Sequence, residues 1–79
     1  MQSKEQVYRV MYDRNLPSWM IQMEGRERPL TRTTAKAEAV ELALKLARSA
    51  ELGHVLVHRE DGSVETEHTY GEDRSRRAS

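Results

Sequence analysis

The chain of 79 residues has no cysteine and no phenylalanine, and only two prolines, four glycines and one tryptophan. Without cysteine, neither a disulfide framework nor a thiolate zinc site can stabilise it. A domain of this size buries only about 60% of the surface that its unfolded chain exposes. The sequence therefore predicts one small core, for which self-association is the substitute for the missing covalent or metal staples.

The chain also lacks an excess of either charge, because 13 basic residues balance 13 acidic ones and the sequence pI is about 6.8. No apolar run is long enough for a membrane span, and residues 1–5 do not lead into the hydrophobic stretch of a signal peptide. We expect a cytoplasmic protein that does not bind membranes. We also expect a single domain over residues 6–71, with residues 1–5 and the polar tail 72–79 disordered.

Several runs have the composition of β-strands. Residues 6–12 are rich in β-branched and aromatic side chains, and residues 19–23 alternate as a returning strand would after the loop 13–18. The segment 26–32 reads as an edge strand or a loop, since Pro29 cannot donate a hydrogen bond to a neighbouring strand. We favour the edge strand.

A helix is predicted from Thr34 to Leu52. Thr34 is a residue type that caps helix N-termini, and Gly53 stands where a left-handed C-cap is wanted. Apolar residues then recur every three or four positions, which is the spacing of one buried helix face. That face would carry Ala39, Leu42, Ala43, Leu46, Ala47 and Ala50.

After the helix, the Asp61-Gly62 pair separates two β-rich runs at 54–60 and 63–70. This pair is typical of a two-residue type I′ turn, which predicts a tight hairpin. Such a turn places His58 opposite Glu65. It places four residues on the core side of the hairpin: Val55, Val57, Val64 and Thr66.

These elements predict an α+β fold. We expect an antiparallel β-sheet of four to five strands with one α-helix packed on one face, in the order ββ(β)-α-ββ. Short hairpins before and after a single helix permit this arrangement, and it requires no parallel crossover.

No pattern in the sequence fixes a reaction. There is no cysteine nucleophile, no serine lies in a Gly-x-Ser-x-Gly context, and the glycines are too dispersed to cradle a phosphate. His54 and His58 share a strand face about 13 Å apart, while His68 points the other way, so one metal ion could not bind all three. We expect a non-enzymatic protein with no catalytic, cofactor-binding or metal-binding residues.

A homodimer is the expected assembly, because a single helix covers one face of a sheet whose strands are apolar on both. Leu56 and Met20 point away from the expected core side and are the candidate interface residues. The alternative is that such residues are scattered singly over a monomer surface. Trp19 fits either an interface anchor or a core position. The core is favoured, because Trp19 lies on the same strand face as Ile21.

Two functions remain open. The preferred one is a protein-interaction or regulatory module with an unidentified protein partner. The alternative is a nucleic-acid-binding accessory protein that uses two arginine clusters, since local basic clusters can bind phosphate in a neutral chain. One is Arg26, Arg28 and Arg32, and the other is formed by the tail residues Arg74, Arg76 and Arg77. Nucleic acid is not favoured as a partner because Glu24, Glu27, Glu72 and Asp73 interrupt or flank the two clusters and the whole chain lacks a basic surplus.

The chain resembles the small bacterial family known as Domain of Unknown Function 2188, over nearly all of residues 6–73. The family pattern has a tryptophan at the start of a strand, an alanine-rich helix opened by threonine, a strand ending in histidine, an Asp-Gly turn and a closing Tyr-Gly-x-Asp. Two departures are Ser18 in place of a glycine and Thr34 one position early. The resemblance implies a bacterial or phage origin and a compact α+β fold, and no reaction. The matching residues are Trp19, Glu38-Ala39, Leu46-Ala47, His58, Asp61-Gly62 and Tyr70-Gly71-Glu72-Asp73.

Overall fold

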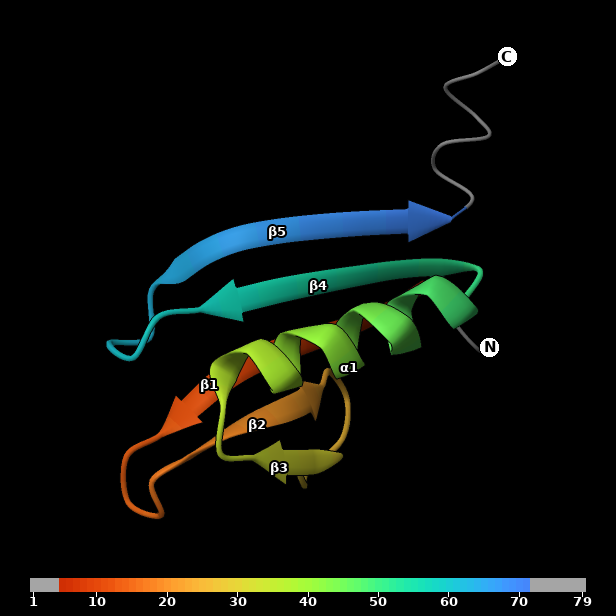
Figure 1. Ribbon diagram of the computed structural model, residues 1–79. Helices are drawn as coiled ribbons and strands as arrows, with labels where there is room; N and C mark the ends of the chain where they lie inside the picture. Colours follow the sequence, from red (N-terminus) through yellow and green to blue (C-terminus); the bar gives the residue numbers. More distant parts are fainter. Residues whose placement is uncertain (1–4, 72–79) are drawn as a thin grey trace.

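The computed structural model describes residues 5–71, which form one five-stranded sheet with one helix across it (Figure 1). The α+β prediction is confirmed. Glu5 begins the first strand, so it does not belong to a disordered N-terminus, and residues 1–4 and 72–79 lie outside the described part. The elements are β1 (Glu5–Asp13), β2 (Ser18–Met23), β3 (Thr31–Thr33), α1 (Lys36–Ser49), β4 (Leu52–His58) and β5 (Val64–Gly71).

The sheet is mixed, with the strand order β3-β2-β1-β4-β5. Strand β1 pairs in parallel with β4, which places Tyr8 beside Val55, while the other three pairings are antiparallel. A parallel pair needs a crossover connection, and α1 forms part of it. The expectation of a purely antiparallel sheet was therefore wrong at this one pair, which joins the two hairpins.

The core lies between α1 and one face of the sheet. The helix contributes three alanines spaced four residues apart, and Val40 and Leu44 pack beside them. Leu42 and Leu46, which the spacing also placed on the buried face, are 37% and 38% exposed. The small alanine side chains let the helix approach the sheet closely. The buried residues are Tyr8, Val10, Trp19, Ile21, Ala39, Ala43, Ala47, Val55 and Val57.

The helix is shorter than predicted at both ends. Its N-cap is Ala35, which has no capping side chain, while the Thr33 hydroxyl donates to the Ala35 carbonyl at 2.8 Å. Gly53 is not a C-cap but a residue of β4, and a Cβ there would lie 2.3 Å from the Ala47 carbonyl oxygen. The absence of a side chain at Gly53 thus lets the helix pack closely on the sheet.

No helix among residues 5–71 is long and apolar enough to cross a membrane.

The β4–β5 connection is a three-residue loop instead of the predicted two-residue turn. Arg59 pairs with Ser63 through a backbone hydrogen bond of 2.7 Å, and the Gly62 N–H donates to the Arg59 carbonyl at 2.9 Å. Gly62 has φ +97°, while Asp61 does not have the positive φ that a type I′ turn needs. The arrangement is that of a turn followed by a left-handed glycine.

A β-bulge follows this loop and changes the register. Val57 lies opposite Thr66 as predicted, but His58 lies opposite Val64, so Glu65 is the extra residue. The predicted His58–Glu65 pair is therefore absent. Val64 leaves the core side and is 48% exposed.

The segment 26–32 is mainly a loop. Only its last two residues enter β3, a three-residue strand at the sheet edge. Pro29 lies in the loop before it, where its missing N–H is not needed. The prediction of an edge strand is thus confirmed, but the strand is shorter than predicted and begins only at Thr31.

Candidate functional site

The side of the sheet turned away from α1, here called the open face, is formed by residues that alternate with the core positions. Along β1, for example, Arg9 lies between the buried Tyr8 and Val10 and points to the opposite side. No helix or strand within residues 5–71 packs on this face (Figure 1). By alternation and register it carries Val7, Arg9, Met11, Met20, Gln22, Arg32, His54, Leu56, His58, Val64, Glu67 and Thr69.

Four apolar side chains surround Arg9 in the middle of the open face. Met11 pairs with Met20 across β1 and β2, and Leu56 lies beside Arg9 on the neighbouring β4. Together with Val7, these half-buried side chains form what we call the central apolar patch: Val7, Met11, Met20 and Leu56. A partner that covers them removes apolar surface from water, at about 25 cal/mol per Å².

Arg9 stands within this patch and holds a network of three polar groups. Its guanidinium donates to the Glu24 carboxylate at 2.9 Å and lies 3.2 Å from His58 Nε2. His58 Nδ1 lies 2.9 Å from the Gly62 carbonyl oxygen. Since a carbonyl only accepts and a guanidinium only donates, this geometry requires the proton on Nδ1 and a lone pair on Nε2. The network links the β2–β3 loop, β1, β4 and the β4–β5 loop.

The other two histidines occupy different positions. His54 is also on the open face, with Nδ1 3.1 Å from the Thr69 hydroxyl and Nε2 2.5 Å from Glu5 Oε2. His68 lies opposite Val55 and hence on the helix side. Among residues 5–71, no three His, Asp or Glu side chains gather in a way that could hold a metal ion.

The three interface candidates separate onto the two faces. Met20 and Leu56 belong to the central apolar patch. Trp19 is only 7% exposed on the helix side, where its ring lies 5.0 Å from that of Tyr12. The Lys36 ammonium is 5.4 Å from the same indole. Trp19 is thus a core residue, which is the position that its alternation favoured.

The three arginines of the basic cluster also separate. Arg26 and Arg28 have exposed side chains in the β2–β3 loop. The Gln22 side-chain amide holds the backbone of this loop, because its Nε2 donates to the Arg26 carbonyl oxygen at 2.6 Å. Arg32 projects from β3 onto the open face and forms an ion pair of 3.3 Å with Asp13. The structure therefore places one of the three on the open face, already engaged by a carboxylate.

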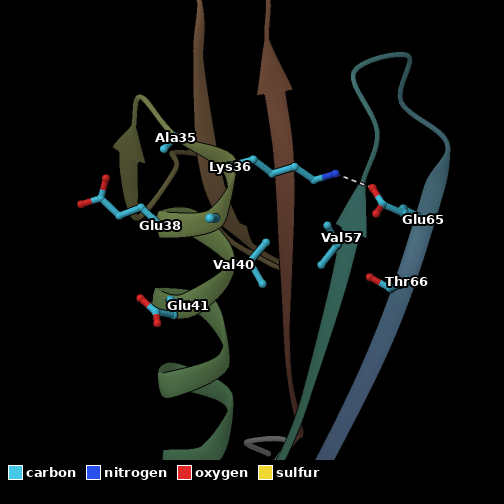
Figure 2. A pocket seen from close by; sticks show the side chains of 9 residues that line it. Ala35, Lys36, Glu38, Val40, Glu41, Val57, Glu65 and Thr66 are labelled. Carbon is cyan, nitrogen blue, oxygen red and sulfur yellow. Dashed lines mark hydrogen bonds and ion pairs between the residues drawn. The ribbon is translucent and has the colours of Figure 1, made fainter.

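Figure 2 shows a second feature, a groove of about 880 Å³ between the first turns of α1 and strands β4 and β5. Val40 of α1 and Val57 of β4 line it, and Lys36 reaches across it to form an ion pair with Glu65. The hydrogen bond and charge of Lys36 hold the pKa of Glu65 below its ordinary value. This pair ties the bulge of β5 to the helix, which gives the groove a structural role.

The sequence indicated Met20 and Leu56 through strand alternation but not the role of Arg9. The alternation of Val7, Arg9 and Met11 within a strand was a usable signal, since it puts a charge between two apolar residues on one face. What no local pattern showed is that His58 and Glu24 converge on Arg9. That convergence depends on the parallel pairing of β1 with β4.

A bacterial family described as "Uncharacterized protein conserved in bacteria (DUF2188)" matches residues 8–70. The chain belongs to this family. The match begins within β1 and ends within β5, so it includes the Arg9–His58–Gly62 network and most of the open face. No curated protein and no solved structure matches the chain. The family description assigns no activity.

Proposed function

We propose that this DUF2188 protein is a non-enzymatic interaction or regulatory module that binds a protein partner through the open face. The observation that carries the proposal is the central apolar patch, four half-buried apolar side chains around Arg9 on the sheet face opposite the helix. On the helix side, comparable residues such as Val10 and Ile21 are fully buried. Apolar patches with a polar rim are typical of protein–protein interaction sites.

The rim of the open face supports a protein partner. Arg32 stands at the β3 edge and Glu67 on β5, so charged side chains flank the apolar middle on both sides. Protein interfaces commonly combine a water-excluded apolar centre with a polar, hydrogen-bonding rim. Methionine suits the centre of such a site because its flexible, polarisable side chain adapts to the shape of a partner.

The distribution of aromatic residues disfavours the nucleic-acid alternative. Sheets that bind single-stranded nucleic acids stack bases on aromatic side chains. All four aromatic residues of the chain, the single tryptophan and three tyrosines, lie on the helix side of the sheet. Within residues 5–71, the arginines that support the alternative are the exposed Arg26 and Arg28, because Arg9 and Arg32 are paired with carboxylates. The tail arginines Arg74, Arg76 and Arg77 lie outside the described residues.

Site-specific photo-crosslinking in bacterial cells tests the proposal. A photoreactive residue at position 56 reports on the open face, and the same residue at position 42, an exposed leucine position on the helix, is the matched control. We expect protein adducts from position 56 in clear excess over those from position 42. Equal yields at the two positions, or none at position 56, would contradict the proposal.

A further inference from the structure

We propose that the outer edge of β5 binds an extended segment of another protein, which adds to the sheet as a further strand and carries a lysine or arginine opposite Glu67. This edge is separate from the open face, so the inference goes beyond the proposed function and does not rest on it. Strand β5 is the last in the sheet order, and within residues 5–71 no strand pairs with its outer side (Figure 1). On an edge strand, every second residue directs its backbone N–H and C=O outward, where an added strand can pair with them.

The two edges of the sheet differ in how they are protected against such pairing. At one edge, β3 has only three residues, and Pro29 lies shortly before it. Short strands and prolines are among the features that keep a sheet edge from pairing with another chain. At the other edge, β5 has eight residues, most of them exposed, with neither proline nor lysine among them. The β5 edge is therefore the one that can accept another strand.

The regular part of the β5 edge is five residues long. At its start, the bulge at Glu65 interrupts the register between β5 and β4. At its end, Gly71 has φ +110°, which lies outside the extended range of a strand. Between these two points, residues 66–70 pair in unbroken register with residues 53–57. An added segment thus finds five consecutive extended residues, a length of about 16 Å at about 3.3 Å per residue.

The charge of this stretch indicates the chemistry of the segment. Glu67 is the only carboxylate among residues 66–70, which include no lysine or arginine, and its side chain is exposed. No ion pair within residues 5–71 involves Glu67, whereas Glu65 is bound by Lys36. Opposite charges directly across two strands stabilise their pairing, and like charges destabilise it. A basic residue opposite Glu67 meets this requirement, while a second copy of β5 would bring another carboxylate and no lysine or arginine.

The helix side of the same edge favours apolar residues in the segment. Thr66, His68 and Tyr70 point to that side, and Tyr70 packs against the core. Thr66 also lines the groove of Figure 2, together with Val57. Because side chains alternate along a strand, the residues that flank the basic one in the segment point to the helix side. Valines there would border partly buried surface, and β-branched residues suit such a position.

A peptide titration of the full chain, followed by NMR, tests the inference. The probe is Val-Thr-Val-Lys-Val-Thr-Val, flanked by Gly and Ser at both ends for solubility, with its lysine opposite Glu67. A range up to about 2 mM suits a short peptide, because a Kd of 1 mM corresponds to only about 4 kcal/mol. We expect saturable shifts in β5 and slower amide exchange at alternate residues of 66–70. Such alternation marks strand addition, since only the outward N–H groups gain a partner.

A charge exchange tests the basic residue. A matched peptide with glutamate in place of lysine should bind the wild type at least about twofold less tightly, because it puts like charges across the two strands. Glu67→Lys should reverse the order of the two peptides. Glu27→Lys makes the same change of charge at an exposed position of the β2–β3 loop and should leave the wild-type order unchanged.

The absence of saturable shifts over the whole range would overturn the inference. Shifts on the open face or at β3, without slower exchange in β5, would overturn it as well, because the peptide would then bind another surface. Equal binding of the two peptides would remove the basic residue from it. Alternate protection that appears without peptide as the chain is concentrated would assign the edge to a second copy instead. The crosslinks from position 56 judge the proposed function separately, so either proposal can fail without the other.

Discussion

The imidazole of His58 joins the β4–β5 loop to the middle of the sheet. Its Nδ1 lies 2.9 Å from the Gly62 carbonyl oxygen, and its Nε2 lies 3.2 Å from the Arg9 guanidinium. The ring is 7% exposed, so water cannot readily replace either partner. His58 therefore fixes the loop conformation and, through Arg9, the charge pattern of the open face.

Replacing His58 with phenylalanine should destabilise the fold by about 1–3 kcal/mol, because the Gly62 carbonyl and Arg9 lose a partner in a shielded place. Urea unfolding followed by circular dichroism measures this loss. His58→Gln provides the control, since its amide can both donate and accept, and it should recover part of the stability. A His58→Phe variant as stable as the wild type would show that the two bonds contribute nothing.

Two glycine substitutions should differ in cost for different reasons. Gly62 has φ +97° with open space around its Cα, so Gly62→Ala should lose only backbone energy, about 1–2 kcal/mol. Gly53→Ala should lose more, at the upper end of ~1–3 kcal/mol or beyond, because the new methyl meets the Ala47 backbone. Thermal unfolding compares them. Gly53→Asn separates the two roles of Gly53, since a helix C-cap would tolerate asparagine and a packing glycine would not.

The strands and their order could be read from local pattern, whereas part of their pairing could not. Alternation in 6–12 and 19–23 identified β1 and β2, and Asp61-Gly62 marked a hairpin. A two-residue type I′ turn needs a positive φ at both Asp61 and Gly62, whereas the observed loop has a positive φ at Gly62 alone. The Asp-Gly dipeptide is compatible with both loops. Because the loop has one more residue than predicted and a bulge follows it, every partner nearer the loop than Thr66 is displaced.

Non-local geometry accounts for the other differences. Nothing in the residues of β1 or β4 encodes that they lie side by side in parallel, because that pairing follows from how α1 returns the chain. The helix pattern placed Leu42 and Leu46 on the buried face together with four alanines. The bare backbone of Gly53 lets the helix lie close to the sheet, where alanines fit, and the two leucines are partly exposed at the sides. On the open face, strand alternation was sufficient to predict that Met20 and Leu56 point away from the core.

The Asp61 carboxylate should make stability depend on pH. It accepts from the Ser63 backbone N–H at 2.9 Å and the Ser63 hydroxyl at 2.7 Å, and these bonds hold its pKa below the ordinary value of 3.8. A depressed folded pKa stabilises the protein above the unfolded value and loses that effect as the pH falls through the folded one. Asp61→Asn should thus unfold at a lower temperature than wild type at pH 7 and at a similar one near pH 2.

A matched background checks the cause of this effect. In Ser63→Ala the hydroxyl that Asp61 binds is gone, so Asp61→Asn should produce a smaller difference at pH 7 there than in the wild type. A difference of the same size in both backgrounds would assign the effect to the backbone N–H and to Arg59 alone. A wild-type advantage that persists unchanged at pH 2 would rule out the carboxylate charge as its source.

Nucleic-acid binding should be weak and should not depend on the arginine cluster. Arg26 and Arg28 lie in a loop, Arg32 is paired with Asp13, and neither the tryptophan nor any tyrosine stands on the open face to stack a base. Fluorescence anisotropy with single- and double-stranded DNA and RNA at about 50 mM salt, where phosphate contacts are strongest, is the most permissive assay. We expect no binding at micromolar protein, and no change when all three arginines become alanine. Micromolar or tighter binding that disappears in this triple variant and falls steeply by about 200 mM salt would replace the protein-interaction function with the nucleic-acid one.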